Sequence, residues 1–324
     1  MLRDKDRFQH AITQGPLVSV IIATYNRGYI VHEAVESVLA QTYNLIEIIV
    51  VDDGSVDNTQ SVLRTYGSKI RVLEQANAGP ASARNMGIQA SQGDIICFLD
   101  SDDIWLPTYV ERQVALLEKV GPSIPCSLGN AITFWADGRE TTSFDLAILK
   151  PQLEEGLWLN VLEVLLTRFV MCNQMLAIRR SALNKAGSFD PSLRYMEDYD
   201  LALRLAVETR WGFIREPLVV FRQSTKGDSL SLSLSSRDPR LQQYIVGILQ
   251  NLEAVFRCRD GITRSSYMGA RIRRARRDLW VTGILDKHSI MKRYALKLGK
   301  LAERIDWMFC GQLPLLPKMK AAPI

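Results

Sequence analysis

Two aspartates one residue apart, Asp100 and Asp102, directly follow the apolar run Ile95–Leu99. That run has the length and composition of a buried strand, so both carboxylates are expected at the rim of a sheet. Carboxylate oxygens are ligands for hard cations, and Mg²⁺ commonly sits between one or two carboxylates and the phosphates of a substrate. The pair therefore indicates phosphate chemistry, although Asp-x-Asp also occurs in solvated turns.

The elements that must position these carboxylates alternate along the first part of the chain. Four apolar runs predict strands, at Leu17–Ala23, Leu45–Val51, Ile70–Leu73 and Ile95–Leu99. Helices are expected between them, one around Val31–Leu39, one from near Asp57 and one from near Pro80. The first has apolar residues at the spacing of one helix face, and the third begins with a proline, which suits the first helical position. This alternation is typical of a mainly parallel sheet with helices on both faces.

Three polar clusters are expected to meet at one edge of that sheet. They are Thr24-Tyr25-Asn26-Arg27, Asp52-Asp53-Gly54-Ser55 and Asp100-Ser101-Asp102-Asp103. Right-handed crossovers place the C-terminal ends of the strands on one edge, where open α/β sheets bind ligands. Each cluster taken alone also fits an ordinary polar loop, in which the aspartates cap the next helix and the arginine is a solvated surface residue.

The chain from 104 to 222 has a less regular pattern. A helix near Pro107–Lys119, strands near Ser127–Trp135 and Gln174–Ile178, and a helix from about Glu197 are expected there. They predict the remaining, partly antiparallel half of the same domain.

Composition narrows the class of protein. The chain has 324 residues, 47% of them hydrophobic, which is enough for a full core. Its five cysteines are odd in number and have no close pair, so neither a disulfide framework nor a zinc site is expected. The first residues lack the apolar segment of a signal peptide, and no run of about 18 apolar residues predicts a membrane-spanning helix. We expect a cytoplasmic protein.

The net charge of +5 is unevenly distributed. Residues 257–304 hold 14 Lys+Arg and 4 Asp+Glu, a net +10 that leaves −5 for the rest. Within this segment Met268, Ile272, Ala275 and Leu279 have helical spacing, which predicts an amphipathic basic helix. It can dock on the rest of the chain, bind an anionic membrane surface or stay solvated. Nucleic acid is not expected, because no aromatic side chains are interleaved with the arginines.

Five ordered blocks carry a family resemblance: VSVIIATYNR, IIVVDDGSVDNT, NAGPASARNMGI, GDIICFLDSDDIWLP and YMEDYDLALRLA. In this order they resemble the blocks of a family 2 glycosyltransferase. The resemblance implies the A-type glycosyltransferase fold, a Rossmann-like mixed, mainly parallel sheet sandwiched by helices, here with a C-terminal helical extension. It covers about residues 17–222 and implies a catalytic domain at 17–225, preceded by an N-terminal extension at 1–16. The Ser-rich run GDSLSLSLSSRDP predicts a flexible loop at 226–237, and the Arg-rich helical pattern after it predicts a basic helical region at 238–324. The catalytic domain divides into a nucleotide-binding half, 17–103, and an acceptor half, 104–225.

The resemblance further implies a site for a nucleoside-diphosphate sugar, with UDP as the expected nucleotide. The implied donor-binding residues are Thr24, Tyr25, Asn26, Arg27, Asp52, Asp53, Arg84, Asp100 and Ser101. Asp102 is the implied direct ligand of Mn²⁺ or Mg²⁺, with Asp100 as a second ligand, through water, or closer to the ribose. Arg84 either serves the donor phosphates from a helix N-terminus or pairs with a nearby acidic side chain. Asp103 is expected to cap a helix.

Asp198 resembles the general base of inverting members, which implies a single displacement onto a hydroxyl of a glycan or lipid-linked acceptor. Glu197 would orient the acceptor or the base, and Trp105 is expected in the wall of the acceptor or donor site. Alone, the two acidic residues would also fit the first turn of a helix as capping residues. Family members often carry a histidine shortly after a strand like VVFR, but here Arg222-Gln223-Ser224 follows, which leaves the third metal ligand to water.

Two other readings stay open. A sugar nucleotidyltransferase would share the sheet and the carboxylates, but ATYNRGYI is not the Gly-rich basic loop that it requires. A non-catalytic nucleotide-sugar-binding module is disfavoured by the intact Asp100, Asp102 and Asp198.

The Gln-x-x-Arg-Trp motif of processive synthases is incomplete at Arg210-Trp211, so one sugar is expected to be added per encounter. The sequence favours no oligomeric state.

Overall fold

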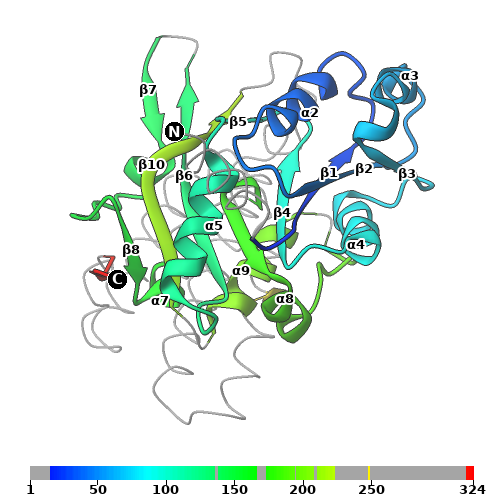
Figure 1. Cartoon of the computed structure of the whole chain (residues 1–324). Helices are drawn as coiled ribbons and strands as arrows, with labels where there is room; N and C mark the ends of the chain where they lie inside the picture. The colour runs from blue at the N-terminus through cyan, green and yellow to red at the C-terminus, as the bar shows by residue number, and fades with distance from the viewer. Residues whose placement is uncertain are drawn as a thin grey trace, which may run out of the picture. The chain divides into compact units, whose positions relative to one another are not determined.

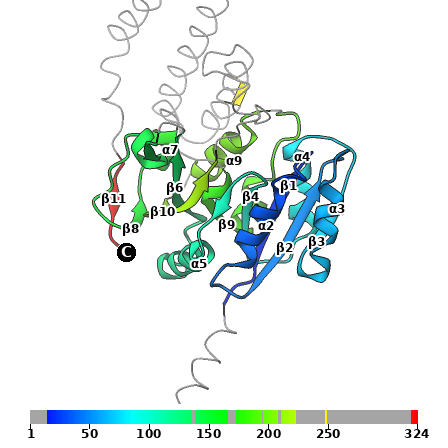
Figure 2. The same ribbon diagram turned by 90° about the horizontal axis from the view of Figure 1, so that it is seen from above.

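The computed structural model describes residues 15–135, 138–165, 173–193, 195–207, 210–222, 247–248 and 319–324. Residues 1–223 and 318–324 form one compact unit, and residues 224–317 form a second. Almost all described residues belong to the first unit, shown in Figures 1 and 2. Residues 1–14 of the predicted N-terminal extension, the loop at 226–237 and the basic segment 257–304 lie outside the described residues.

One mixed sheet runs through this first unit, in the order β11-β8-β10-β6-β9-β4-β1-β2-β3. Its first half is parallel and consists of β1 (Val18–Thr24), β2 (Ile46–Asp52), β3 (Arg71–Glu74) and β4 (Ile95–Asp100). Its second half consists of β6 (Cys126–Phe134), β8 (Glu155–Trp158), β9 (Leu176–Arg179), β10 (Trp211–Phe221) and β11 (Ala321–Ala322). Two short strands pair alongside, β5 (Ile104–Trp105) with β10 and β7 (Glu140–Thr142) with β6. The predicted parallel half and partly antiparallel half are both confirmed.

Helices cover both faces of the sheet. They are α2 (Val31–Leu39), α3 (Thr59–Arg64), α4 (Pro80–Ala90), α5 (Tyr109–Val120), α6 (Ser143–Leu146), α7 (Val161–Leu165), α8 (Arg180–Ala186) and α9 (Glu197–Ala206). Two 3₁₀ turns, η1 (Gly67–Lys69) and η2 (Asn173–Met175), complete the described elements. Figure 2 shows α2 and α5 on one face and α4 and α9 on the other. None of the helices in the described ranges is both long and apolar enough to cross a bilayer.

Close packing of α4 on β1 fixes the position of the loop before this helix. Gly87 lies against Ile21, and a Cβ added at Gly87 would come within 2.4 Å of a side-chain carbon of Ile21. The strand beneath is almost completely buried, because helices cover both of its faces. Pro80 begins α4, as the sequence predicts. The N-terminal turn of α4 is therefore held at the edge where β1 and β2 end.

The C-terminal ends of the main strands share one edge. Thr24 pairs with Asp52, and Ala23 pairs with Asp100, so β1, β2 and β4 end together. Because β9 is antiparallel to both β4 and β6, and β10 is parallel to β6, the ends of β6 and β10 lie on this edge too. The edge therefore gathers the three predicted polar clusters, together with the residue that follows β10, Arg222.

The end of the chain returns to the sheet. Ala321 and Ala322 pair with β8, and the backbone N–H of Leu159 donates to the carbonyl of Lys320 over 2.8 Å. Within the region expected to be helical, 238–324, these last residues thus form a strand. Two alanines carry no strand pattern, so this pairing has no local signal in the sequence.

Candidate active site

Arg84, in the second turn of α4, connects two acidic groups from distant parts of the chain. Its Nη2 lies 2.7 Å from Oδ1 of Asp100, and its Nη1 lies 2.6 Å from Oε1 of Glu197. Its side chain is only 7% exposed, so these are short, charge-assisted contacts in a largely dry environment. Burial works against the charge of Arg84, but the two carboxylates outweigh it and raise the pKa of the guanidinium. Arg84 therefore pairs with nearby acidic side chains, one of the two roles expected from the sequence.

Asp100 and Asp102 lie at the end of β4 with their side chains partly open to solvent. They are 31% and 25% exposed, respectively, and Ser101 between them is buried. Burial and the charge of Asp100 raise the pKa of Asp102, and Arg27, whose Nη2 is 3.5 Å from Asp102 Oδ2, partly offsets this. Two carboxylates that disfavour each other's charge form a donor set that suits a hard cation.

The donor set is small. Within the described ranges, no group of three or more His, Cys, Asp or Glu side chains is arranged to hold a metal ion. Asp100 and Asp102 fit the mode in which Mg²⁺ or Mn²⁺ is shared between one or two carboxylates, substrate phosphates and water.

Asp103 does not cap a helix, contrary to the expectation from the sequence. It is 6% exposed, and its Oδ1 accepts a hydrogen bond of 2.9 Å from the backbone N–H of Arg222. Its Oδ2 accepts from the side chain of Gln174 in η2. Asp103 precedes β5 instead of a helix, so its carboxylate faces the interior, where it joins the loop after β4 to β10 and η2.

The loops after β1 and β2 hold each other. The backbone N–H of Asn26 donates to Ser55 Oγ over 2.8 Å, and Asn26 Oδ1 accepts from the N–H of Val56 over 2.8 Å. Asn26 adopts a left-handed conformation with φ of 52°, which asparagine tolerates better than most residues. The side chain of Tyr25, 47% exposed, lies at the surface of this rim.

Asp52 and Asp53 have different roles in the structure. Both oxygens of Asp53 are used: Oδ1 accepts from the N–H of Ala78 at 2.8 Å and from Gln75 Nε2 at 2.6 Å, and Oδ2 accepts from the N–H of Gly79 at 2.9 Å. Asp52 uses only Oδ1, which accepts from Ser55 N at 3.0 Å, and its buried Oδ2 has no partner in the part of the chain that the structure describes. Asp53 therefore shapes the loop before α4, while Asp52 keeps an unused acceptor.

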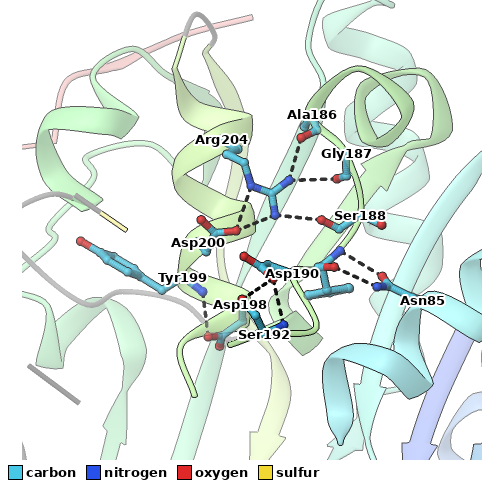
Figure 3. A network of polar contacts seen from close by, with 11 residues as sticks. Asn85, Ala186, Gly187, Ser188, Asp190, Ser192, Asp198, Tyr199, Asp200 and Arg204 are labelled. Carbon is cyan, nitrogen blue, oxygen red and sulfur yellow. Dashed lines mark hydrogen bonds and ion pairs between the residues drawn. The ribbon is translucent and has the colours of Figure 1, made fainter. Parts of the chain in front are cut away.

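The start of α9 brings Glu197 and Asp198 to the same edge. Met196, just before the helix, has a left-handed backbone with φ of 66°, which is uncommon outside glycine. The Oδ1 of Asp198 accepts a hydrogen bond of 2.7 Å from the N–H of Tyr199 (Figure 3). Burial and the charge of Glu197 raise the pKa of Asp198 to about 7, with Arg84 working in the opposite direction. Such a carboxyl group can exchange a proton near neutral pH.

The loop before α9 is held from both sides. Arg204 of α9 donates to Asp200 and to the carbonyls of Ala186, Gly187 and Ser188, all within 3.1 Å (Figure 3). On the other side, Asn85 of α4 exchanges two hydrogen bonds with the backbone of Phe189, at 2.8 and 3.0 Å. These clamps fix α9 relative to α4 and thus Asp198 relative to Arg84.

Phe189 and Arg204 were not predicted from the sequence. The Phe189 ring packs edge-on against Phe98 of β4, with centroids 5.0 Å apart, and lies 5.5 Å from the Arg84 guanidinium. The only local signal was the apolar character of Phe189, which fits any core position equally well.

Trp105 does not line an open site. Its side chain is 2% exposed and stacks on Tyr109, with ring centroids 4.0 Å apart. Its Nε1 donates to the carbonyl of Gln174 over 3.0 Å. The pairing of β5 with β10 turns this ring into the core, which corrects the expectation of an acceptor or donor wall.

The mixed sheet with carboxylates at its C-terminal edge defines the class: this is the A-type glycosyltransferase fold. Staphylococcus aureus TarS in complex with UDP-GlcNAc superimposes with a TM-score of 0.60 at 18% identity, covering 90% of this chain and 78% of that one. A mannosyltransferase from Pyrobaculum calidifontis, solved with GDP-Man and Mn²⁺, gives a TM-score of 0.54 at 17% identity over 90% of this chain and 82% of that one.

Sequence comparison identifies the family. A profile described as glycosyl transferase family 2 matches residues 19–185. An uncharacterized glycosyltransferase of Rickettsia typhi is 36% identical over 65% of either chain, and one of Haemophilus influenzae is 30% identical over 66% of this chain and 71% of its own length. The chain spans 65% of the Rickettsia typhi relative and 57% of one from Rickettsia prowazekii. This chain belongs to glycosyl transferase family 2.

Proposed function

We propose that this protein is a metal-dependent, inverting glycosyltransferase that moves one sugar from a nucleoside-diphosphate sugar to a hydroxyl of a glycan or lipid-linked acceptor. One observation carries the proposal. The buried Arg84 joins Asp100, at the end of β4, to Glu197, the neighbour of Asp198, with contacts of 2.7 and 2.6 Å. A donor-side carboxylate and an acid-base group are thus held in one rigid arrangement.

The donor nucleoside is assigned to the loops after β1 and β2. Oδ2 of Asp52 has no hydrogen-bond partner among the described residues, and a carboxylate accepts hydrogen bonds from a base N–H or a ribose hydroxyl. Tyr25 lies exposed at the rim of the same loops, where an aromatic ring offers a surface for stacking. UDP is the preferred nucleotide, a choice supported by the similarity in fold to TarS, which was solved with UDP-GlcNAc.

The diphosphate is assigned to Asp100 and Asp102, which would hold Mn²⁺ or Mg²⁺ together with phosphate and water. A bound dication supplies stabilisation for the negative charge that develops on the departing nucleoside diphosphate. Arg27 lies 3.5 Å from Asp102 and places a positive charge beside the same pair of carboxylates. The mannosyltransferase solved with Mn²⁺ supports the choice of metal by analogy of fold.

Asp198 is assigned the general base. It accepts the proton of the acceptor hydroxyl while that oxygen bonds to the anomeric carbon of the sugar, and the bond from this carbon to the phosphate oxygen breaks on the opposite face. The anomeric configuration is therefore inverted. A pKa of about 7 is suited to this task, because a base works best with a pKa near the working pH. Glu197, fixed by Arg84, orients Asp198 or the acceptor.

We assign the basic segment 257–304, which lies outside the described residues, to an anionic membrane surface. Cosedimentation with anionic vesicles at low salt tests this assignment. Vesicle binding that persists unchanged after removal of residues 257–304 would refute it.

The function itself is tested by thermal shift with Mn²⁺ and a panel of nucleotide sugars, followed by product analysis with the donor selected. We expect one donor to raise the melting temperature only when Mn²⁺ or Mg²⁺ is present, and the product to have the inverted anomeric configuration. Asp102→Asn should lose the metal-dependent shift. A wild-type protein that binds no nucleotide sugar with either metal would refute the proposal.

A further inference from the structure

Arg222, the first residue after β10, contacts three separate parts of the candidate site. Its backbone N–H donates to Asp103 Oδ1 over 2.9 Å, and its Nε donates to the backbone carbonyl of Asp102 over 2.7 Å. Its Nη1 forms an ion pair with Glu33 in the first turn of α2. A single arginine thus ties the end of β10 and the helix after β1 to the loop after β4.

These contacts act on the main chain at Asp102 and involve no hydrogen bond from Arg222 to the Asp102 carboxylate. The carbonyl of Asp102 and the carboxylate of Asp103 lie on either side of Cα of Asp103, so both bonds restrict the path of the chain directly after Asp102. Gln174 fixes Asp103 from the other side. With the backbone held, the Asp102 side chain retains only its own torsion angles, which limits where its oxygens can lie.

A contribution to the stability of the fold does not by itself explain why an arginine stands at position 222. Its Nη2 is buried and has no hydrogen-bond partner in the described part of the chain. A buried guanidinium donor without a partner costs free energy, whereas an apolar side chain of similar length would fill the space without that cost. Asp103, with its two partners, already anchors the loop to β10 and η2.

We propose that Arg222 is a positioning residue of the donor site, which orients Asp102 toward the metal and the donor diphosphate through the backbone carbonyl of Asp102. This inference rests on the proposed function, because it assigns Arg222 a role in that same metal and diphosphate site. The residue acts through Asp102 and contacts no reacting atom.

The test measures Mn²⁺ binding in the presence of UDP by isothermal titration calorimetry, on the full chain, for wild type, Arg222→Met and Arg112→Met. Arg112 is a matched control, since it forms ion pairs with Glu155 and Glu216 at 3.2 and 3.0 Å. Among the described residues it has no ion pair with Asp100, Asp102 or Asp103. Outer-shell partners of metal ligands typically contribute 10–100-fold to metal affinity. We therefore expect Arg222→Met to weaken the Mn²⁺ Kd about ten-fold and Arg112→Met to leave it unchanged. Arg222→Lys should recover only part of the loss, because an ammonium group cannot reproduce the fork of donors.

The outcomes separate the inference from the proposed function. If wild type and Arg222→Met bind Mn²⁺ and UDP equally well, the inference is overturned and the proposed function stands, even if the variant melts at a lower temperature. If wild type shows no Mn²⁺-dependent binding of UDP or of any other nucleoside diphosphate, both are overturned. Should Arg222→Met fail to fold, Arg222→Lys and Glu33→Gln give the same readout, and a wild-type Kd in both would overturn the inference.

Discussion

Replacing Asp198 by asparagine should abolish sugar transfer and at the same time change how stability depends on pH. The side chain is partly buried, and burial together with Glu197 raises its pKa from 3.8 to about 7. The unfolded chain releases this proton near pH 4, whereas the folded protein keeps it to about pH 7. The folded state therefore binds more protons in this window, and its stability falls as the pH rises through it.

The magnitude follows from the size of the shift. Each pH unit between 5 and 7 costs the wild-type protein up to about 1.4 kcal/mol relative to the variant, or up to about 3 kcal/mol in total. Partial access of water to the side chain reduces this to about 1–2 kcal/mol. For a domain of this size, about 1 kcal/mol corresponds to roughly 2–4 °C in Tm. The Tm of Asp198→Asn minus that of wild type should thus be larger at pH 8 than at pH 5 by at least about 2 °C.

The Tm difference is measured by differential scanning calorimetry at pH 5 and pH 8 in EDTA. Transfer rates are measured separately, with Mn²⁺ and saturating donor. Asp145→Asn serves as the matched Asp-to-Asn control, because Asp145 is exposed on α6. Wild-type transfer should increase with pH through about 7 as Asp198 loses its proton. Equal Tm differences at both pH values would refute the raised pKa, and wild-type-like transfer by Asp198→Asn would remove this residue from the mechanism.

Three further predictions concern binding and stability. Asp102→Asn should bind UDP no more tightly with Mn²⁺ than without it, measured by calorimetry; a retained Mn²⁺ dependence would place the metal elsewhere. Asp53→Asn should lower the free energy of unfolding in urea by about 2–4 kcal/mol, because the N–H groups of Ala78 and Gly79 lose charge-assisted hydrogen bonds. An unchanged urea midpoint would show that the loop does not depend on this carboxylate. Gly87→Ala should lower the free energy of unfolding by about 1–3 kcal/mol in the same assay, since the new Cβ would lie 2.4 Å from a side-chain carbon of Ile21. An unchanged free energy of unfolding would mean that α4 can move away from β1 without loss of stability.

The sequence was sufficient to predict the strands and helices that have a local hydrophobic pattern. Buried strands β1, β2 and β4 appear as apolar runs, and α2 appears as residues spaced along one helix face, because each pattern depends only on neighbours within a few residues. The handedness of the crossovers then predicts Thr24, Asp52 and Asp100 at one edge of the sheet. The register confirms it, with Thr24 opposite Asp52 and Ala23 opposite Asp100.

Contacts between residues far apart in the chain have no such local signal. Arg84 and Glu197 are 113 positions apart, and Arg222 and Asp103 are 119 apart, so no local period records either pair. The burial of Trp105 depends likewise on the pairing of β5 with β10, which sets the face that a two-residue strand presents to the core. Which residues reach the edge of the sheet can thus be derived from the amino-acid order, because local periodicity and chain handedness are enough to place them. Which of their side chains meet is a property of the folded chain, because ion pairs and burial are set by the packing of α4, α9 and β10 around that edge.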